Sequence, residues 1–168
     1  MFWKMLSDFD VPLEGLLNKL SFGQQKKVLI AFGLATNTSL LIMDEPTNGL
    51  DIPSKIQFRK VIASVLTDER CIVISTHQVR DLDSLIDTLI ILHNREIVLN
   101  SSIDEILLKI QFVPASQAGT ADVLYQESQS MGVNTIVAGT EDTFGKVETE
   151  LLFNAIVDGN NSVLTVLR

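Results

Sequence analysis

Residues 40–51 read Leu-Leu-Ile-Met-Asp-Glu-Pro-Thr-Asn-Gly-Leu-Asp, and this stretch decides the fold. Four apolar residues are followed directly by two carboxylates, Asp44 and Glu45. A short apolar run bounded by polar residues predicts a buried strand of a parallel sheet, with both carboxylates at its carboxyl end. Because open α/β sheets bind ligands at that edge, the stretch predicts a functional site there.

Two adjacent carboxylates at a sheet edge suit phosphoryl transfer. That reaction needs one carboxylate to hold Mg²⁺ and another group to orient the attacking water. Asp44 suits the first role and Glu45 the second. Taken alone, the pair is weak evidence, because a strand that ends in two acids often simply reaches solvent.

Helices and strands are expected to alternate on both sides of this strand. Ser21 is a good N-cap for the preceding helix, and Pro53 lies near the first turn of the following one. The expected helices span residues 21–36, 53–66 and 78–86, and further strands span residues 71–75, 88–92 and 96–99 beyond a turn at Asn94-Arg95. This order predicts an α/β fold with a parallel sheet and flanking helices.

The last part of the chain is expected to form secondary structure of a different arrangement. A helix runs from Ser101 or Ser102 to about Lys109, and a small polar loop follows. Beyond it we expect strands at 123–126 and 135–138 across a turn at Met131-Gly132, and an amphipathic helix at 147–157. We therefore divide the chain into a domain of residues 1–112 and a small α+β extension of residues 113–168.

Composition narrows the classes of function. The chain has 168 residues and a net charge of -8, and residues 100–168 carry three basic and nine acidic side chains. An acidic tail argues against nucleic-acid binding. No apolar run approaches the ~20 residues that cross a bilayer, so we expect a cytoplasmic chain. The single cysteine, Cys71, fits a reducing compartment and is expected to be a small buried residue.

Three motifs together resemble a known family. The string at residues 41–51 closely resembles the Walker B motif and D-loop of ATP-binding-cassette (ABC) proteins. Residues 20–24, Leu-Ser-Phe-Gly-Gln, resemble the family's LSGGQ signature, and residues 74–77, Ile-Ser-Thr-His, resemble its switch-histidine motif. The motifs stand in the family's order and at its usual spacings. The resemblance covers about residues 15–110 and implies part of the family's P-loop NTPase fold.

The resemblance implies a role for each signature residue. Ser21 and Gly23 would contact the γ-phosphate of an ATP held mainly by a second cassette, and a helix N-terminus suits a phosphate. Gln24 belongs to the same nucleotide-binding motif. Phe22 stands where the family usually has glycine, and this restricts the backbone conformations open to the loop. A simple N-cap is the alternative reading of Ser21, and both roles are compatible.

The other motifs carry implied roles as well. Asp44 would hold Mg²⁺, Glu45 would be the general base or orient the water, and His77 would sense the γ-phosphate. Asp51 would help to join two cassettes, and an N-cap of the Pro53 helix is an equal alternative. Outside these motifs, His93 is expected at the surface, and Lys26 and Lys27 are expected on a solvated helix face.

The family's phosphate loop, G-x-x-x-x-G-K-S/T, does not occur in the 168 residues, and neither does the glutamine loop. The stretch Gly139 to Lys146 imitates it but has five residues between its glycines, includes two acids, and is followed by Val147. We reject it for these reasons. We therefore expect an incomplete ATP site, as in a fragment, a truncated product or a degenerate cassette, and exposed apolar surface where the parent sheet lacks strands.

The function implied is ATP binding and hydrolysis in a transporter subunit that energises membrane transport, with export favoured. ATP and Mg²⁺ would be the cofactors. The implied partners are a second cassette, identical or paralogous, and an integral membrane permease that holds the chain on the inner face of the membrane. The 168 residues alone are expected to be inactive. The alternatives are a soluble ABC-type ATPase of translation or chromosome maintenance, and a non-catalytic partner cassette.

Overall fold

The computed structural model describes residues 1–83, 85–129, 132–139 and 145–168. The chain divides into two compact units, Met1–Leu85 and Ile86–Arg168, and each is described by itself. The boundary expected at residue 112 lies within the second unit. The assignment of residues 1–112 and 113–168 to separate domains stays a prediction.

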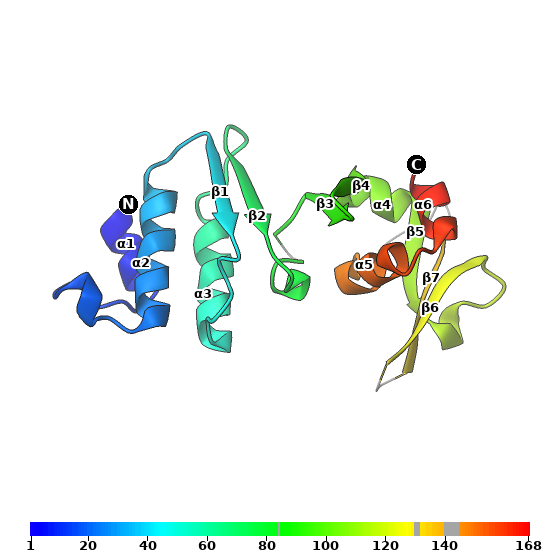
Figure 1. The fold of residues 1–168 in the computed structure, drawn as a ribbon, viewed down its shortest axis with the longest axis horizontal. Coiled ribbons are helices and arrows are strands. Elements are labelled where there is room, and N and C mark those ends of the chain that lie inside the picture. Colours follow the sequence, from blue (N-terminus) through cyan, green and yellow to red (C-terminus); the bar gives the residue numbers. More distant parts are fainter. Residues whose placement is uncertain (84, 130–131, 140–144) are drawn as a thin grey trace. The chain divides into compact units, whose positions relative to one another are not determined.

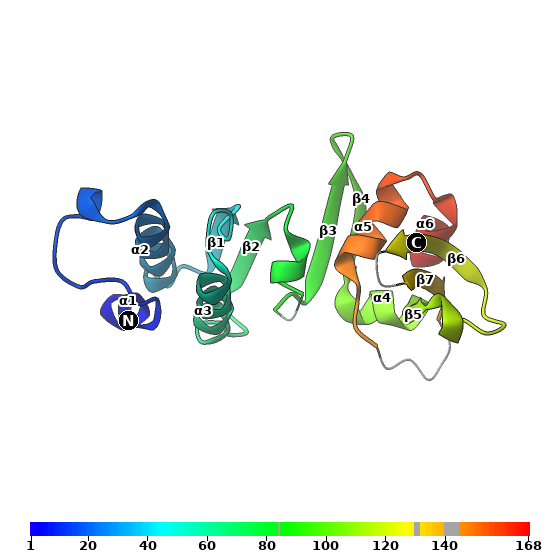
Figure 2. The ribbon, with the colours of Figure 1, turned by 90° about the horizontal axis from the view of Figure 1, so that it is seen from below.

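The first unit contains a small parallel sheet and its helices (Figure 1). In chain order its elements are α1 (Phe2–Asp8), η1 (Leu17–Lys19), α2 (Phe22–Ala35), β1 (Leu40–Asp44), α3 (Ile52–Ala63), β2 (Cys71–Ser75) and η2 (Val79–Asp81). Strands β1 and β2 pair in parallel, with Leu40 opposite Cys71. A parallel pair needs a crossover, which α3 supplies, and Figure 2 shows α3 beneath the two strands. The predicted α/β class is confirmed.

Helices α2 and α3 begin where the sequence predicts because each has a polar N-cap. Ser21 Oγ accepts a hydrogen bond from the backbone N of Gln24 at 3.3 Å, and Gln24 Oε1 accepts one from the backbone N of Ser21 at 3.0 Å. This reciprocal pair is a capping box. Asp51 Oδ1 caps α3 by accepting a hydrogen bond from the backbone N of Ser54 at 2.9 Å.

The two strands are less buried than predicted. Alternate residues of each strand are partly buried, among them Leu41, against which Gly33 of α2 lies closely. The opposite face exposes Leu40 (54%), Ile42 (69%), Val73 (41%) and the thiol of Cys71. The predicted burial of the strands and of Cys71 is therefore wrong. An apolar run is buried on both faces only where both faces are covered, and here helices cover one face.

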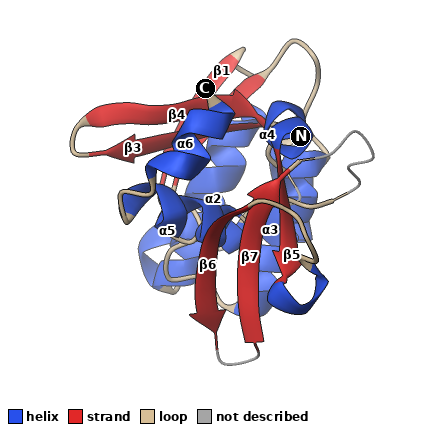
Figure 3. Ribbon diagram, turned by 90° about the vertical axis from the view of Figure 1, so that its right-hand side faces the viewer, coloured by secondary structure: helices blue, strands red, loops and turns tan. Residues whose placement is uncertain are grey.

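The second unit has an α+β fold with its own hydrophobic core. Its elements are β3 (Thr88–His93), β4 (Glu96–Ser102), α4 (Ile103–Lys109), β5 (Ile110–Pro114), η3 (Ala115–Gln117), β6 (Val123–Gln129), β7 (Gly132–Ala138), α5 (Thr149–Val157) and α6 (Asn161–Leu167). Strands β5, β7 and β6 form an antiparallel sheet in that order, as Figure 3 shows. Ile106, Ile136, Leu152 and Val163 are fully buried in its core.

Two details of the prediction need correction. The strand at 88–92 does not extend the parallel sheet but pairs antiparallel with β4. Asn94 and Arg95 have φ values of 51° and 68°, and two left-handed residues make the tight turn of a hairpin. The helix expected at 78–86 is reduced to η2 among the described residues, and residue 84 lies outside them.

Strand β5 and helix α6 were not expected. The strands at 123–126 and 135–138 and the helix at 147–157 are confirmed as β6, β7 and α5, with small shifts at their ends. Met131, expected in the turn between β6 and β7, lies outside the described residues.

Candidate functional site

The carboxyl ends of β1 and β2 bring two of the sequence motifs together. Asp44 lies opposite Ser75 in the parallel register, and the backbone N of Glu45 donates to Ser75 O at 2.9 Å. Residues that follow the two strands therefore meet at one edge of the sheet, as the sequence predicts.

The carboxylate of Glu45 is held by the turn that follows β2. Its Oε1 accepts a hydrogen bond from the backbone N of His77 at 3.0 Å and lies 2.7 Å from His77 Nδ1. Its Oε2 accepts one from Thr76 Oγ1 at 3.3 Å. The Glu45 side chain is 31% exposed and that of His77 is 65% exposed, so the pair is open to a ligand from solvent.

The hydrogen bonds from His77 make the Glu45 carboxyl more acidic. They hold the pKa of the Glu45 carboxyl below its usual value, against a smaller opposing effect of burial. Glu45 is therefore a carboxylate at neutral pH, which requires the proton of the His77 ring to lie on Nδ1. The amide Nε2 of Gln78 lies 3.4 Å from His77 Nε2.

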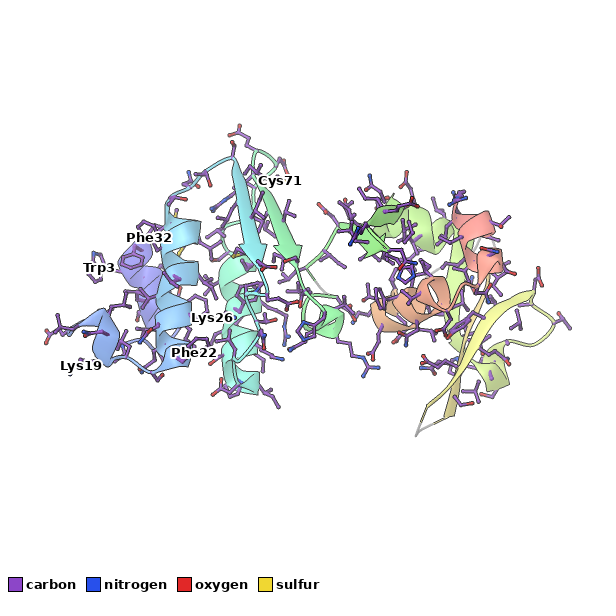
Figure 4. The ribbon with its side chains drawn as sticks, in the orientation of Figure 1. Trp3, Lys19, Phe22, Lys26, Phe32 and Cys71 are labelled. Atoms are coloured by element: carbon purple, nitrogen blue, oxygen red, sulfur yellow. The ribbon has the colours of Figure 1, made fainter. Side chains whose placement is uncertain are left out.

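The backbone of Glu45 has an unusual conformation. Its φ is +45°, in the left-handed region that residues with a Cβ rarely adopt. Lys26 Nζ of α2 donates to Glu45 O at 2.7 Å and to Asn48 O at 2.6 Å. Figure 4 shows Lys26 on the side of α2 that faces α3.

The expectation of a solvated face at Lys26 and Lys27 is wrong. Lys27 Nζ also reaches across the unit, to Phe9 O and Gln57 Oε1, both at 3.0 Å. Sequence reasoning missed Lys26, although its i+4 spacing to Ile30, which is buried, places it on the inner face of the helix.

Asp44 is the candidate ligand for a metal ion. Its Oδ1 accepts a hydrogen bond from Ser75 Oγ, and the residue is exposed at the end of β1. Among the described residues no three His, Cys, Asp or Glu side chains gather as a metal site. Mg²⁺ is commonly held by one or two carboxylates together with the phosphates of a nucleotide, so one carboxylate here fits Mg²⁺ that arrives with ATP.

The signature residues form a second group at the N-terminus of α2. Ser21 and Gln24 are engaged with each other in the capping box, and Phe22 is 73% exposed. The Phe22 ring lies against Gly49, where an added Cβ would stand 3.4 Å from Phe22 Cε1. Gly23 is partly buried, and an added Cβ there would meet no atom within 4 Å. The described hydrogen bonds do not join Ser21 or Gln24 to Glu45 or His77.

Asp51 is the N-cap of α3, so this interpretation of the residue is confirmed. The hydrogen bonds from Ser54 hold the pKa of its carboxyl below the usual value. A role in joining two cassettes stays a prediction. His93 lies at the end of β3, opposite Glu96, and is partly buried.

The stretch that imitates a phosphate loop has a structural explanation at its first glycine. The backbone N of Gly139 donates to Lys109 O at 2.8 Å, and an added Cβ would stand 2.8 Å from Leu108 O. The position needs glycine because two backbones approach closely there. Residues 140–144 lie outside the described residues.

Comparisons with known proteins agree with the motifs. A family model described as ABC transporter matches residues 4–48. The ABC transporter ATP-binding protein NatA of Bacillus subtilis (strain 168) is 31% identical over 86 residues, which are 51% of this chain and 35% of that protein. The molybdenum import ATP-binding protein ModC of Mycobacterium tuberculosis (strain ATCC 25618 / H37Rv) is 31% identical over 133 residues, or 79% of this chain and 32% of that protein.

A solved structure of the ATP binding subunit of an ABC transporter is also similar, with a TM-score of 0.54 and 25% identity. The match covers 61% of this chain and 44% of that one. Part of the chain is therefore homologous to the ATP-binding cassettes of ABC transporters. The chain spans about a third of the length of NatA and ModC.

Proposed function

We propose that this chain supplies the catalytic carboxylate edge and the signature helix of an ABC transporter subunit that binds and hydrolyses ATP. The observation that carries the proposal is the ionised Glu45 carboxylate, hydrogen-bonded to His77 at the carboxyl end of a parallel sheet. The partial homology to ABC transporter ATP-binding subunits supports the same function.

Each residue of the edge has a role that its contacts allow. Asp44 would hold Mg²⁺, which supplies positive charge against the phosphates when it is bound. Glu45 would orient the attacking water and accept its proton. Oε1 of Glu45 is taken up by His77, whereas Oε2 has a single 3.3 Å hydrogen bond from Thr76. We therefore assign the water to Oε2.

His77 would both orient Glu45 and contact the γ-phosphate. Nδ1 is directed at Glu45, so the contact with phosphate would fall to Nε2 of the exposed ring, which donates when it carries a proton. Ser21 and Gly23, with Phe22 and Gln24, would contact the γ-phosphate of an ATP bound mainly by a second cassette. The first amide groups of α2, a helix of 14 residues, favour an anion there.

The partners are a second cassette, identical or paralogous, and an integral membrane permease. No helix among the described residues is long and apolar enough to cross a membrane. We therefore propose that contact with the cytoplasmic face of the membrane is made through the permease. Export stays the predicted direction, and ModC is a relative whose name refers to import.

A non-catalytic partner cassette is the second candidate. The 168 residues contain no G-x-x-x-x-G-K-S/T sequence, which supports this alternative and the expectation that the chain alone is inactive. The Glu45–His77 pair favours catalysis, because a cassette that only lends its signature does not need an oriented base.

The test uses two samples: the chain alone, and the chain joined to a cassette that has a phosphate loop, called the joined assembly. For each sample, ATP binding is measured by calorimetry and ATP hydrolysis by its turnover rate, both with Mg²⁺. Glu45→Gln should lower turnover of the joined assembly by at least about 100-fold and leave ATP affinity unchanged. Glu96→Gln, which alters an exposed acid of the β3–β4 hairpin, is the matched control. Wild-type turnover in Glu45→Gln would reject the catalytic role and favour the non-catalytic alternative.

A further inference from the structure

The ammonium group of Lys26 connects α2 to the loop after β1. Lys26 Nζ donates to the backbone carbonyls of Glu45 and Asn48, 19 and 22 residues further along the chain, at 2.7 and 2.6 Å. Both acceptors are neutral main-chain oxygens. Lys26 therefore acts on the path of the backbone, and neither of these two bonds involves a carboxylate.

The backbone conformation of Glu45 is unfavourable by itself. With φ at +45°, the residue is in a conformation that costs free energy for any side chain with a Cβ. Surrounding contacts must hold it there. The backbone N of Glu45 donates to Ser75 O at 2.9 Å, and its carbonyl accepts from Lys26 and from the backbone N of Asn48 at 3.3 Å.

The left-handed turn at Glu45 decides where its carboxylate lies. The chain leaves β1 and reverses at once, and the side chain meets the backbone N and ring of His77. An extended Glu45 would direct its carboxylate differently, because side chains of successive extended residues alternate between faces. The contact between Glu45 and His77 therefore depends on the backbone that Lys26 holds.

A second contact on the same helix face reinforces the connection. Phe22, four residues before Lys26, lies against Gly49, whose φ is +77°. Lys26 and Phe22 of α2 thus touch the loop at Glu45, Asn48 and Gly49.

We propose that Lys26 is a positioning residue for Glu45: its ammonium group holds the left-handed turn that places the Glu45 carboxylate against His77. The catalytic consequence rests on the proposed ATPase function. The geometric part stands without it and is tested without nucleotide.

The first experiment uses NMR on the 168-residue chain at one neutral pH. Lys26→Met should change the ring ¹⁵N shifts of His77 and accelerate exchange of the Glu45 and Asn48 amide protons by at least about tenfold, because a charge-assisted hydrogen bond is lost. Lys26→Arg, which can still donate to two carbonyls, should restore both signals. Lys27→Met is the matched control, since Lys27 binds Phe9 and Gln57 instead.

Unchanged His77 shifts in a folded Lys26→Met protein, with the amides of β1 still protected, would overturn the proposal. Should Lys26→Met fail to fold, Lys26→Gln replaces it, and the same signals decide: wild-type values overturn the proposal and shifted values support it. Equal perturbation by Lys26→Met and Lys27→Met overturns it as well.

The second experiment measures steady-state ATP hydrolysis by the joined assembly. Lys26→Met should lower kcat at least about tenfold and leave KM for ATP unchanged, because Lys26 acts through Glu45 rather than on the nucleotide. An unchanged kcat overturns the catalytic consequence. If the wild-type assembly hydrolyses no ATP, the proposed function fails, and the NMR result still decides the role of Lys26.

Discussion

Replacing Ser21 separates the two roles assigned to this residue, the cap of α2 and the contact with phosphate. Alanine removes the oxygen that serves both roles. Aspartate keeps a capping oxygen but places a negative charge where a phosphate would bind. The two variants should therefore differ in stability and agree in their loss of function.

The structure indicates the size of the stability effect. The hydrogen bond from Gln24 N to Ser21 Oγ is 3.3 Å long, beyond the usual range for this kind of bond, so we expect Ser21→Ala to cost about 1 kcal/mol rather than more. The reciprocal bond to Gln24 Oε1 does not use the Ser21 side chain and survives. Ser21→Asp should match or exceed wild-type stability, because its charge also favours the helix N-terminus.

Urea unfolding followed by fluorescence of Trp3 measures this effect. Trp3 is the only tryptophan of the chain and lies in α1, which packs beside α2 in the first unit. With a slope of about 1 kcal/mol per molar for a small unit, Ser21→Ala should lower the midpoint by about 1 M. Equal midpoints for Ser21→Ala and Ser21→Asp would refute the capping argument. Retained ATP turnover of the joined assembly with Ser21→Asp would refute the phosphate role.

Two further predictions concern the second unit. Tyr125, the only tyrosine, donates to Asp158 Oδ2 at 2.7 Å, and this bond raises the pKa of the phenol to about 12. An absorbance titration should show that value, and Asp158→Ala should lower it toward about 10. Because the folded pKa is the higher one, the associated stability is present below about pH 10 and lost toward pH 12; ionisation near 10 in the wild type would contradict this. Leu152→Ala should cost about 3 kcal/mol of unfolding free energy, measured by tyrosine fluorescence, because Leu152 is fully buried. Leu108→Ala, at a position 73% exposed, should change it by less than about 0.5 kcal/mol, and similar losses in both variants would disprove the packing argument.

The exposed face of the β1–β2 sheet affects whether the isolated chain associates in solution. Leu40, Ile42 and Val73 expose apolar side chains on neighbouring strands. Apolar surface of this kind favours association, so the experiments above need dilute protein and a check of its oligomeric state.

Local features of this protein could be predicted from its sequence. The starts of α2, α3 and α4 depend on the caps Ser21, Asp51 and Ser102, and each cap bonds a backbone amide three residues away. A strand at 40–44 with carboxylates at its end follows from an apolar run and its polar boundary. Such interactions lie within a few residues, so a local pattern contains them.

The tertiary structure alone decided the arrangement of the candidate site. Sequence placed Glu45 and His77 at one edge, but their hydrogen bonds depend on a left-handed turn at Glu45, which no local preference for glycine or asparagine marks. The sequence predicted a solvated Lys26, because the two carbonyls that accept its hydrogen bonds are 19 and 22 residues away along the chain. The exposure of Cys71 likewise depends on which elements cover the sheet. These features arise from contacts between distant segments, whose geometry is set only when the helices and strands pack.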